Sequence, residues 1–457
     1  MKPINMNKVD VINPFNQQVI SKVKLDDKKQ IQQKIVQCAE QFKKPLSVEQ
    51  RKAGLQKWAL LIEQQKPLLA GLITQEQGKP LREALGEVDY ALSYIHYYQN
   101  LINDAFFEPK NTAPSVFESY RPYGVCAFIT PWNFPVAMLV RKVAPAIAAG
   151  NAVIAKPSEL TPLSAKAVHA LFVEAFGLSS LFELSVCDAP IFSDVIMADS
   201  RVRKISFTGS TRVGRLLIEA SAFDIKRLSL ELGGDAPCIV LPSANLEQAV
   251  EGVMDAKFRN AGQTCVAINH LYIHSAIEAE FLERLTHKIQ LLNCGDGLER
   301  DVDIGPMIHI DALKQRNEWV TQALSNGAQL ICVGQNSHPL VCMTPMLIKN
   351  VNKTDELNQQ ELFAPVLVAS TFNDLNEVIE EINESTMGLA GYVFTQDQNE
   401  IKQCEQKIST GMLGINTGKI SNAQAPFGGV KHSGFGREGG RIGVEEFMTI
   451  HYSARPN

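Results

Sequence analysis

The sequence of 457 residues lacks the features that mark membrane and secreted proteins. Its most apolar stretch, residues 135–149, is interrupted by Arg141 and Lys142 and is too short to cross a bilayer. The first seven residues contain no apolar core region and no cleavage signature, so we expect no secretory signal. These absences predict a protein that is not secreted and does not associate with membranes.

Cysteines in pairs are also absent. The nine cysteines are an odd number and occur singly, with no two at the spacing of metal ligands. This distribution argues for a reducing location, the cytoplasm, and predicts neither a zinc site nor another metal site. The cysteines are Cys38, Cys126, Cys187, Cys238, Cys265, Cys294, Cys332, Cys342 and Cys404.

An excess of positive charge is lacking as well. The formal net charge is -5, and the basic cluster at 201–204 is interpreted as solvated surface, so we expect no nucleic-acid partner. Hydrophobic residues make up 45% of the chain and charged residues 20%, which is ordinary for a globular enzyme. A chain of this length exceeds what one hydrophobic core usually supports, which predicts two large domains.

The first hundred residues are predicted to be helical, as the spacing of Leu55, Trp58, Ala59 and Ile62 indicates. Short apolar runs then alternate with helical patterns, which is typical of a mostly parallel, buried sheet that binds ligands at the carboxyl ends of its strands. A nucleotide site is the natural expectation there. The expected strands are 124–129, 152–155, 182–187, 203–207 and 226–231, and the expected helices include 164–176 and 213–222.

A second α/β pattern begins after about residue 234, where we place the domain boundary. It comprises a helix at 246–259, a loop that contains Cys265, a strand at 270–274 and a helix at 276–292. The terminal segment 451–453 is predicted to be an edge strand used in assembly.

Cys265 and Glu231 are the first candidates for chemistry. Cys265 ends a loop of small residues, and Glu231 ends an expected strand. A thiol nucleophile that forms an acyl intermediate needs a base to activate water, so the two side chains together suggest covalent catalysis. Asn133, in the rigid turn 130–135 with its two prolines, is a candidate donor to an oxyanion, with backbone capping as the alternative.

Two expected strand ends offer a nucleotide site. At Gly209 and Ser210, small residues let a phosphate approach the start of the following helix. Lys156 and Glu159 follow another strand, and a carboxylate beside the ribose favours a free 2′-hydroxyl, hence NAD over NADP. Structural glycine and solvated side chains are the alternatives for these positions.

Seven motifs in this order resemble the NAD(P)-dependent aldehyde dehydrogenase superfamily over nearly the whole chain. The resemblance implies that Cys265 attacks the aldehyde carbon, that Asn133 and the Cys265 N–H hold the oxyanion, and that Glu231 activates the water that hydrolyses the thioester. It assigns Glu361 and Phe363 to the nicotinamide ribose and ring, and Trp132, Lys156, Glu159, Gly209 and Ser210 to the rest of the cofactor. The motifs are residues 131–135, 156–159, 207–210, 231–234, 262–265, 361–365 and 426–429.

The family fold implies an α/β protein with three parts. A Rossmann-like NAD-binding domain is expected at 1–103 and 123–233, and an α/β catalytic domain at 234–428. A small β oligomerisation element is expected at 104–122 and 429–457, with a strand around 114–122. NAD is the favoured cofactor, NADP is possible, and a homodimer or homotetramer is expected.

Arg141 and Arg259 bear on the choice of aldehyde. Two guanidinium groups that converge on one pocket would bind a distal carboxylate, whereas the alternative is that each is a structural ion-pair partner. Residues 257–265 and 414–422 resemble the succinate-semialdehyde dehydrogenase branch, in which two arginines and a serine, here Arg141, Arg259 and Ser421, bind that carboxylate. The resemblance therefore implies oxidation of succinate semialdehyde to succinate.

Other interpretations of the function remain open. Glutarate semialdehyde is an alternative substrate, because two arginines recognise charge better than chain length. A catalytically retired homologue is a further alternative, against which the set of Cys265, Glu231 and Asn133 argues. A CoA-dependent acylating enzyme is another, against which Glu231 as hydrolytic base argues. Three departures stand out: Ala267 replaces the second cysteine that many members of the branch have, residues 176–191 lack the usual glycine-rich turn, and Asp235 stands where Asn is commoner.

Overall fold

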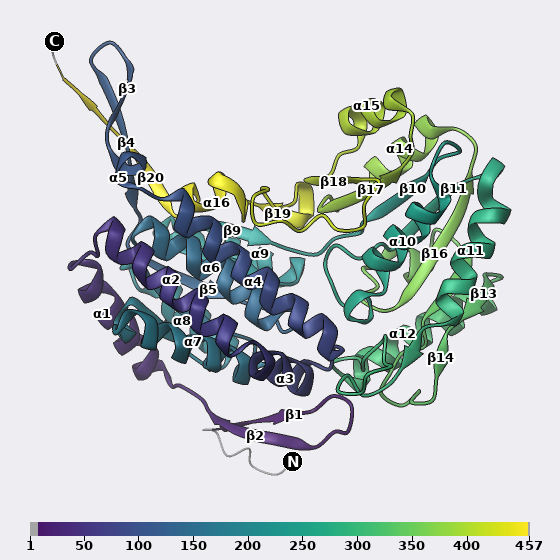
Figure 1. The fold of residues 1–457 in the computed structure, drawn as a ribbon, viewed down its shortest axis with the longest axis horizontal. Coiled ribbons are helices and arrows are strands. Elements are labelled where there is room, and N and C mark those ends of the chain that lie inside the picture. Colours follow the sequence, from purple (N-terminus) through teal and green to yellow (C-terminus); the bar gives the residue numbers. More distant parts are fainter. Residues whose placement is uncertain (1–7, 456–457) are drawn as a thin grey trace.

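The computed structural model describes residues 8–455, which form two α/β bodies side by side (Figure 1). A six-stranded sheet organises the body that contains the N-terminal helices, and a seven-stranded sheet organises the other. A slender three-stranded sheet projects from the first body, and the C-terminal strand belongs to it.

The six-stranded sheet has the order β19-β9-β8-β5-β6-β7. From β9 to β7 all neighbours are parallel, so five carboxyl ends lie at one edge, while β19 pairs antiparallel with β9. The strands are β5 (Val125–Ile129), β6 (Ala152–Lys156), β7 (Phe182–Leu184), β8 (Val202–Thr208), β9 (Arg227–Glu231) and β19 (Gly434–Phe435).

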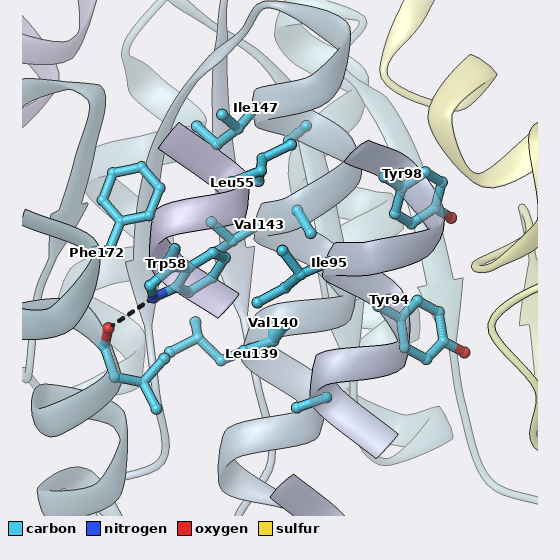
Figure 2. Close-up of a cluster of buried hydrophobic side chains, with 14 of the residues drawn as sticks. Leu55, Trp58, Tyr94, Ile95, Tyr98, Leu139, Val140, Val143, Ile147 and Phe172 are labelled. Carbon is cyan, nitrogen blue, oxygen red and sulfur yellow. Dashed lines mark hydrogen bonds between the residues drawn. The ribbon is translucent and has the colours of Figure 1, made fainter. Parts of the chain in front are cut away.

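Helices cover both faces of this sheet. On one face α6 (Pro135–Ala149), in which all fifteen residues are buried, packs against α4 (Leu81–Leu101). The apolar run at 135–149 is therefore the central helix of a core, and Figure 2 shows Val140, Val143 and Ile147 of α6 in that core. The remaining helices are α1 (Lys28–Phe42), α2 (Val48–Gln64), α3 (Lys66–Gln77), α5 (Asp104–Phe107), α7 (Pro162–Phe176), α8 (Ala189–Ala198) and α9 (Thr211–Ser221).

The seven-stranded sheet has the order β13-β15-β16-β11-β10-β17-β18 and is parallel except at β13. Its strands are β10 (Pro237–Val240), β11 (His270–His274), β13 (Gln329–Val333), β15 (Met346–Lys349), β16 (Val366–Phe372), β17 (Ala390–Phe394) and β18 (Met412–Ile415). The helices around it are α10 (Leu246–Lys257), α11 (Glu278–Gln290), α12 (Ile310–Ser325), α13 (Glu356–Gln359), α14 (Leu375–Glu384) and α15 (Gln398–Lys407).

Three small sheets complete the fold. In the projecting sheet, β4 (Val116–Pro122) pairs with β3 (Lys110–Ala113) and with β20 (Met448–Ala454), which follows α16 (Gly440–Glu445). The other two sheets are β1 (Lys8–Ile12) with β2 (Val19–Lys24), and β12 (Asn293–Cys294) with β14 (Gln335–Asn336).

Several element predictions need correction. The first hundred residues are not all helical, because β1 and β2 occupy residues 8–24. Their alternation of exposed and buried residues is too short and too polar for a clear period of two, and Val11 and Val23 are buried by tertiary contact with Val186. The strand expected at 182–187 ends at residue 184, and the helix expected at 246–259 ends at residue 257.

Two predicted strands of the second half of the chain agree with the structure. The expected strand 270–274 is β11, and the expected terminal strand 451–453 lies within β20 and pairs with β4 of the same chain. Among residues 8–455, we find no helix that combines the length and the apolar character required to traverse a bilayer.

Candidate active site

One cavity of about 500 Å³ lies between the carboxyl edge of the six-stranded sheet and the segment that precedes β11. It brings together eleven of the thirteen predicted site residues, whereas Lys156 and Glu159 do not line it. The eleven are Trp132, Asn133, Arg141, Gly209, Ser210, Glu231, Arg259, Cys265, Glu361, Phe363 and Ser421.

Cys265 reaches this cavity from a turn with unusual backbone angles. The 3-10 turn at Arg259–Gly262 has positive φ at three consecutive residues, namely 54° at Asn260, 54° at Ala261 and 69° at Gly262. A left-handed conformation costs roughly 1–2 kcal/mol for a residue with a Cβ. Gly262 is required for a second reason, because a Cβ there would lie 2.3 Å from the carbonyl oxygen of Ala364.

Hydrogen bonds of the Asn260 side chain and backbone hold this turn in place. Its backbone N–H donates to Glu83 Oε2 at 2.7 Å, and its Nδ2 donates to the carbonyl oxygen of Asn133 at 3.1 Å. Gln77 Nε2 in turn donates to Asn260 Oδ1 at 2.9 Å. Because each group is buried or partly buried, these bonds offset the strained backbone and fix the position of Cys265.

Asn133 is held from the opposite side of the cavity. Glu87 accepts hydrogen bonds at 2.9 and 3.2 Å from the first backbone N–H groups of α6 and pairs with Lys79 at 2.6 Å. Lys79 Nζ donates to the Asn133 carbonyl oxygen at 2.7 Å. The Asn133 Nδ2 donates one hydrogen to the Gln263 carbonyl oxygen at 3.1 Å, which leaves its second hydrogen for the cavity.

Glu231 is buried at the end of β9, and within residues 8–455 neither carboxylate oxygen has a hydrogen-bond partner. Burial, and then the negative charge of Glu438, raises its pKa well above the usual value, while Arg141 and Lys142 oppose the rise. Gly428 leaves room for this carboxylate, since a Cβ there would lie 2.8 Å from Glu231 Oε1. A carboxyl group with a raised pKa is suited to take a proton near neutral pH.

Glu438 is a residue that the sequence interpretation missed. It is buried and forms ion pairs with both Arg141 and Lys142. Although burial alone would raise its pKa, these two cations lower it, so Glu438 stays charged. The only signal was the density of glycine and charge at 428–443, which is equally typical of an exposed tail.

The Cys265 thiol is half-buried and protonated at neutral pH. Burial, followed by the charge of Glu361, raises its pKa to about 12, and Arg141 opposes the rise. The thiolate is the reactive form of cysteine. Nucleophilic attack by this thiol would therefore require a group that takes its proton.

The carboxyl edge of the six-stranded sheet carries the residues expected to hold the cofactor. Lys156, at the end of β6, pairs with Glu159 at 2.9 Å. Burial alone would raise the pKa of Glu159, but Lys156 lowers it, so this carboxylate is charged. The pair lies beyond the cavity, next to the end of β5, at the part of the edge farther from Glu231.

The N-terminus of α9 fits a phosphate group. Ser210 caps the helix, and its Oγ accepts from the Val213 N–H at 3.4 Å. At Gly209 an added Cβ would lie 2.4 Å from the Phe207 ring, so only glycine leaves the backbone approachable here.

An aromatic pair and a carboxyl group flank the rest of the cavity. The rings of Trp132 and Phe363 pack edge to face, with their centroids 5.7 Å apart. Glu361 Oε1 accepts from the Gly234 N–H at 3.2 Å, and burial raises its pKa to about 7. These residues provide flat surfaces and an acceptor between the phosphate end and Cys265.

Arg141 and Arg259 both line this cavity, and each has a buried donor that lacks a partner among the described residues. Among the described residues, the buried atoms Arg141 Nη2 and Arg259 Nε have no hydrogen-bond partner. The Arg141 guanidinium also lies 4.2 Å from the centre of the Phe427 ring. Ser421 lines the cavity from the segment after β18. Buried donors without partners are costly, so this arrangement suits an incoming anion.

The departures from the family pattern lie outside the cavity. Asp235 does not line the cavity, and it contacts His270 Nε2 at 3.1 Å and Asn269 Nδ2 at 3.2 Å. In the segment 176–191, the Val186 side chain packs against β1 and β2, and its carbonyl oxygen accepts from the Asp26 N–H at 2.8 Å. The segment without the glycine-rich turn is thus fixed by the N-terminal strands.

Comparison with known proteins gives a consistent picture. A model of the aldehyde dehydrogenase family matches residues 2–452. Succinate semialdehyde dehydrogenase of Acinetobacter baylyi is 39% identical over 456 residues, which cover 98% of this chain and 94% of that protein. The NADP(+)-dependent succinate-semialdehyde dehydrogenase GabD of Escherichia coli is 40% identical over 413 residues, or 89% and 85% of the two chains.

The fold has close counterparts among solved structures. The crystal structure of an aldehyde dehydrogenase from Brucella melitensis biovar abortus superposes with a TM-score of 0.95 at 38% identity, covering 98% of this chain and 94% of that chain. The predicted fold class, an aldehyde dehydrogenase-like α/β protein, is confirmed.

Proposed function

Because the chain belongs to the aldehyde dehydrogenase family, we propose that it oxidises an aldehyde with a distal carboxylate, succinate semialdehyde, to the dicarboxylate succinate. Family membership supplies the general reaction, NAD(P)-dependent oxidation of an aldehyde. The choice of substrate is supported by the residues of the site and by two relatives whose names include succinate semialdehyde.

Within the site, one observation supports this choice of substrate. The side chains of Arg141 and Arg259 line the cavity that holds Cys265, and their buried atoms Arg141 Nη2 and Arg259 Nε have no hydrogen-bond partner among the described residues. A carboxylate that accepts from both would relieve the desolvation of two cations, which an uncharged aldehyde does not do. We assign Ser421 a third donor role because this residue lines the same cavity.

In this proposal Cys265 is the nucleophile and Asn133 holds the oxyanion. The free Nδ2 hydrogen of Asn133 and the Cys265 backbone N–H would stabilise the charge that develops on the aldehyde oxygen. Glu231 is the base that activates water for hydrolysis of the Cys265 thioester, and its raised pKa makes it a stronger base than an ordinary carboxylate. Loss of the thiol proton precedes attack, because the pKa of Cys265 is about 12.

We assign the cofactor to the carboxyl edge of the six-stranded sheet. Trp132, Lys156, Glu159, Gly209 and Ser210 would hold the adenosine and phosphate groups, and Glu361 and Phe363 the nicotinamide ribose and ring. When bound, NAD(P) accepts the hydride that leaves the aldehyde carbon.

We further propose that NAD is preferred over NADP. The charged carboxylate of Glu159 neutralises Lys156 at 2.9 Å and would repel a 2′-phosphate on the ribose. The Escherichia coli relative is named for NADP(+). Specificity can thus differ between this chain and that relative.

Replacement of Arg259 by Ala tests the proposal. The purified wild-type protein should prefer succinate semialdehyde to butanal, an uncharged aldehyde of the same chain length, and Arg259→Ala should reduce that preference at least tenfold, as the loss of one charge-assisted hydrogen bond predicts. An unchanged preference would refute the carboxylate site. NADH formation in the wild type also excludes a retired homologue.

Two enzymatic alternatives are decided by the same assay. A series of aldehydes with a terminal carboxylate and increasing length separates succinate semialdehyde from glutarate semialdehyde. A requirement for CoA would identify an acylating enzyme, against which the presence of Glu231 as hydrolytic base argues.

Domain division, assembly and location complete the proposal. We assign 1–103 and 123–233 to the cofactor domain, 234–428 to the catalytic domain, and 104–122 with 429–457 to oligomerisation, although β19 joins the six-stranded sheet. Exposed Ile450 and Tyr452 on β20 support a homodimer or homotetramer. All nine cysteines are free, which supports a reducing location, the cytoplasm.

A further inference from the structure

Tyr90 of α4 lines the cavity together with Cys265 and the two arginines, and neither the motifs nor the proposed mechanism uses it. It is half-buried and lies one helical turn before Tyr94. The two hydroxyl oxygens are 2.8 Å apart and share one hydrogen bond, in which either can be the donor. The direction of this bond decides what Tyr90 offers to the cavity.

Tyr94 is fully buried, and its hydroxyl group points away from the aliphatic core (Figure 2). In the part of the chain that the structure describes, the only hydrogen bond of the Tyr94 hydroxyl group is the one to Tyr90. The neighbouring Arg141 guanidinium, 5.6 Å from the centre of the Tyr94 ring, carries donors only and cannot accept a proton.

A count of protons then gives the direction of the bond. Two hydroxyl groups carry two protons, and one hydrogen bond between them uses one. If Tyr90 donated, the Tyr94 proton would be buried without an acceptor, which is costly. Tyr94 therefore donates to Tyr90, and the Tyr90 O–H is free to donate into the cavity.

The space into which Tyr90 donates is next to Arg141. Although burial alone would lower the pKa of Arg141, Glu438 and then the phenol groups of Tyr94 and Tyr90 raise it, so this guanidinium is charged. Because Glu438 already neutralises part of that charge, a further cation here would be expensive to bury. A neutral hydroxyl donor adds a hydrogen bond for a carboxylate without that cost.

We propose that the Tyr90 hydroxyl donates a hydrogen bond to the distal carboxylate of the substrate beside Arg141, and that Tyr94 orients it for this purpose. Tyr90 is thereby a specificity-determining residue. The inference rests on the proposed function, since it requires a carboxylate in this part of the cavity.

The test compares Tyr90→Phe with the wild type on succinate semialdehyde and on butanal. For succinate semialdehyde, kcat/KM should fall about tenfold, with the change in KM rather than kcat, because a hydrogen bond to a charged group is lost. For butanal, kcat/KM should stay within about twofold. Tyr97→Phe, a change on the same helix outside the cavity lining, is the matched control and should alter neither value.

Tyr94→Phe and inhibition by succinate provide independent readouts. Without the Tyr94 donor, the Tyr90 hydroxyl loses its fixed direction, so kcat/KM for succinate semialdehyde should fall about two- to threefold with butanal unaffected. The inhibition constant of succinate should rise in both variants in the same order. If Tyr90→Phe does not fold, as judged by thermal melting, Tyr94→Phe and succinate inhibition decide the matter.

The outcomes separate the two claims. If Tyr90→Phe reduces kcat/KM equally for both aldehydes, or for neither, the role of Tyr90 is overturned. The proposed function still stands in that case if Arg259→Ala loses the preference for succinate semialdehyde. If the wild type does not prefer the carboxylate-bearing aldehyde, both the proposed function and the role of Tyr90 are refuted.

Discussion

Lys142 of α6 and Glu438 of the C-terminal segment, 296 residues apart in sequence, form an ion pair that is almost fully buried. Arg141, the neighbour of Lys142, contacts the same carboxylate. Glu438 thus connects the C-terminal segment to the helix that follows Asn133, and its charge acts on Glu231. The electrostatics of the site depend on a segment that contributes no predicted catalytic residue.

Replacement of Glu438 by Gln should move the acidic limb of the pH profile. Because the charge of Glu438 raises the pKa of Glu231, its removal lowers that pKa, and Glu231 remains an active base at lower pH. The acidic limb of kcat should shift downward by about one pH unit. Glu446→Gln, which changes a carboxylate bound to Lys204 and Ser229, is the control and should not shift it. An upward shift in Glu438→Gln would contradict this account.

Replacement of Glu231 by Gln should separate the two halves of the reaction. If Glu231 activates the hydrolytic water, NADH should appear as a burst of about one equivalent per site, followed by turnover slowed roughly 10²–10⁴-fold. Rapid-mixing measurements of NADH absorbance record both phases. Cys265→Ser should give no burst. Slow turnover in Glu231→Gln without any burst would show that the variant is impaired in a step before the thioester forms, and would contradict the role of Glu231 in hydrolysis.

Replacement of Glu159 by Gln should change the cofactor preference. Without this carboxylate, Lys156 is free to pair with a 2′-phosphate, so the ratio of kcat/KM for NADP to that for NAD should rise about tenfold or more. Glu219→Gln, an exposed carboxylate on α9, serves as the control. A constant ratio in Glu159→Gln would refute the assignment of Glu159 to the ribose.

Gly177 and Gly262 have almost equal φ, so a comparison of their Ala variants distinguishes the cost of backbone strain from the cost of a steric clash. At Gly177, with φ of 68° and nothing within 4 Å of an added Cβ, replacement by Ala should cost about 1–2 kcal/mol of stability and leave kcat unchanged. At Gly262, with φ of 69°, the Cβ would also meet Ala364 at 2.3 Å. Gly262→Ala should therefore be less stable in urea and should lose activity, because the turn before Cys265 must move. Equal behaviour of the two variants would argue against a fixed turn.

The loop that contains Cys265 and the parallel sheet could be predicted from the sequence because their signals are local. The strand at 270–274 alternates with helical patterns on either side, and the loop before Cys265 carries small residues in a recognisable order. Parallel strands align their carboxyl ends, so the proximity of Asn133, Gly209 and Glu231 followed from the topology.

Other parts of the site depend on contacts that no local pattern reports. Strand β19 has two residues and exists only because it pairs with β9, and it lies close to Glu438. Tyr90 and Tyr94 are spaced like ordinary core residues of a helix, and only their hydroxyl contact distinguishes them. Likewise, a glutamate in a glycine-rich segment is indistinguishable from solvated surface until its two cations are known.

The influence of the Arg141 charge on the pKa of Glu231 has a thermodynamic consequence for the binding of an anion. Arg141 lowers the pKa of Glu231, so an anion bound at this guanidinium would weaken that effect and increase the affinity of Glu231 for a proton. Binding free energies are reciprocal, hence protonation of Glu231 must strengthen the binding of the anion to the same degree. A carboxylate ligand and a proton would therefore bind to this cavity with positive cooperativity, and release of one would favour release of the other.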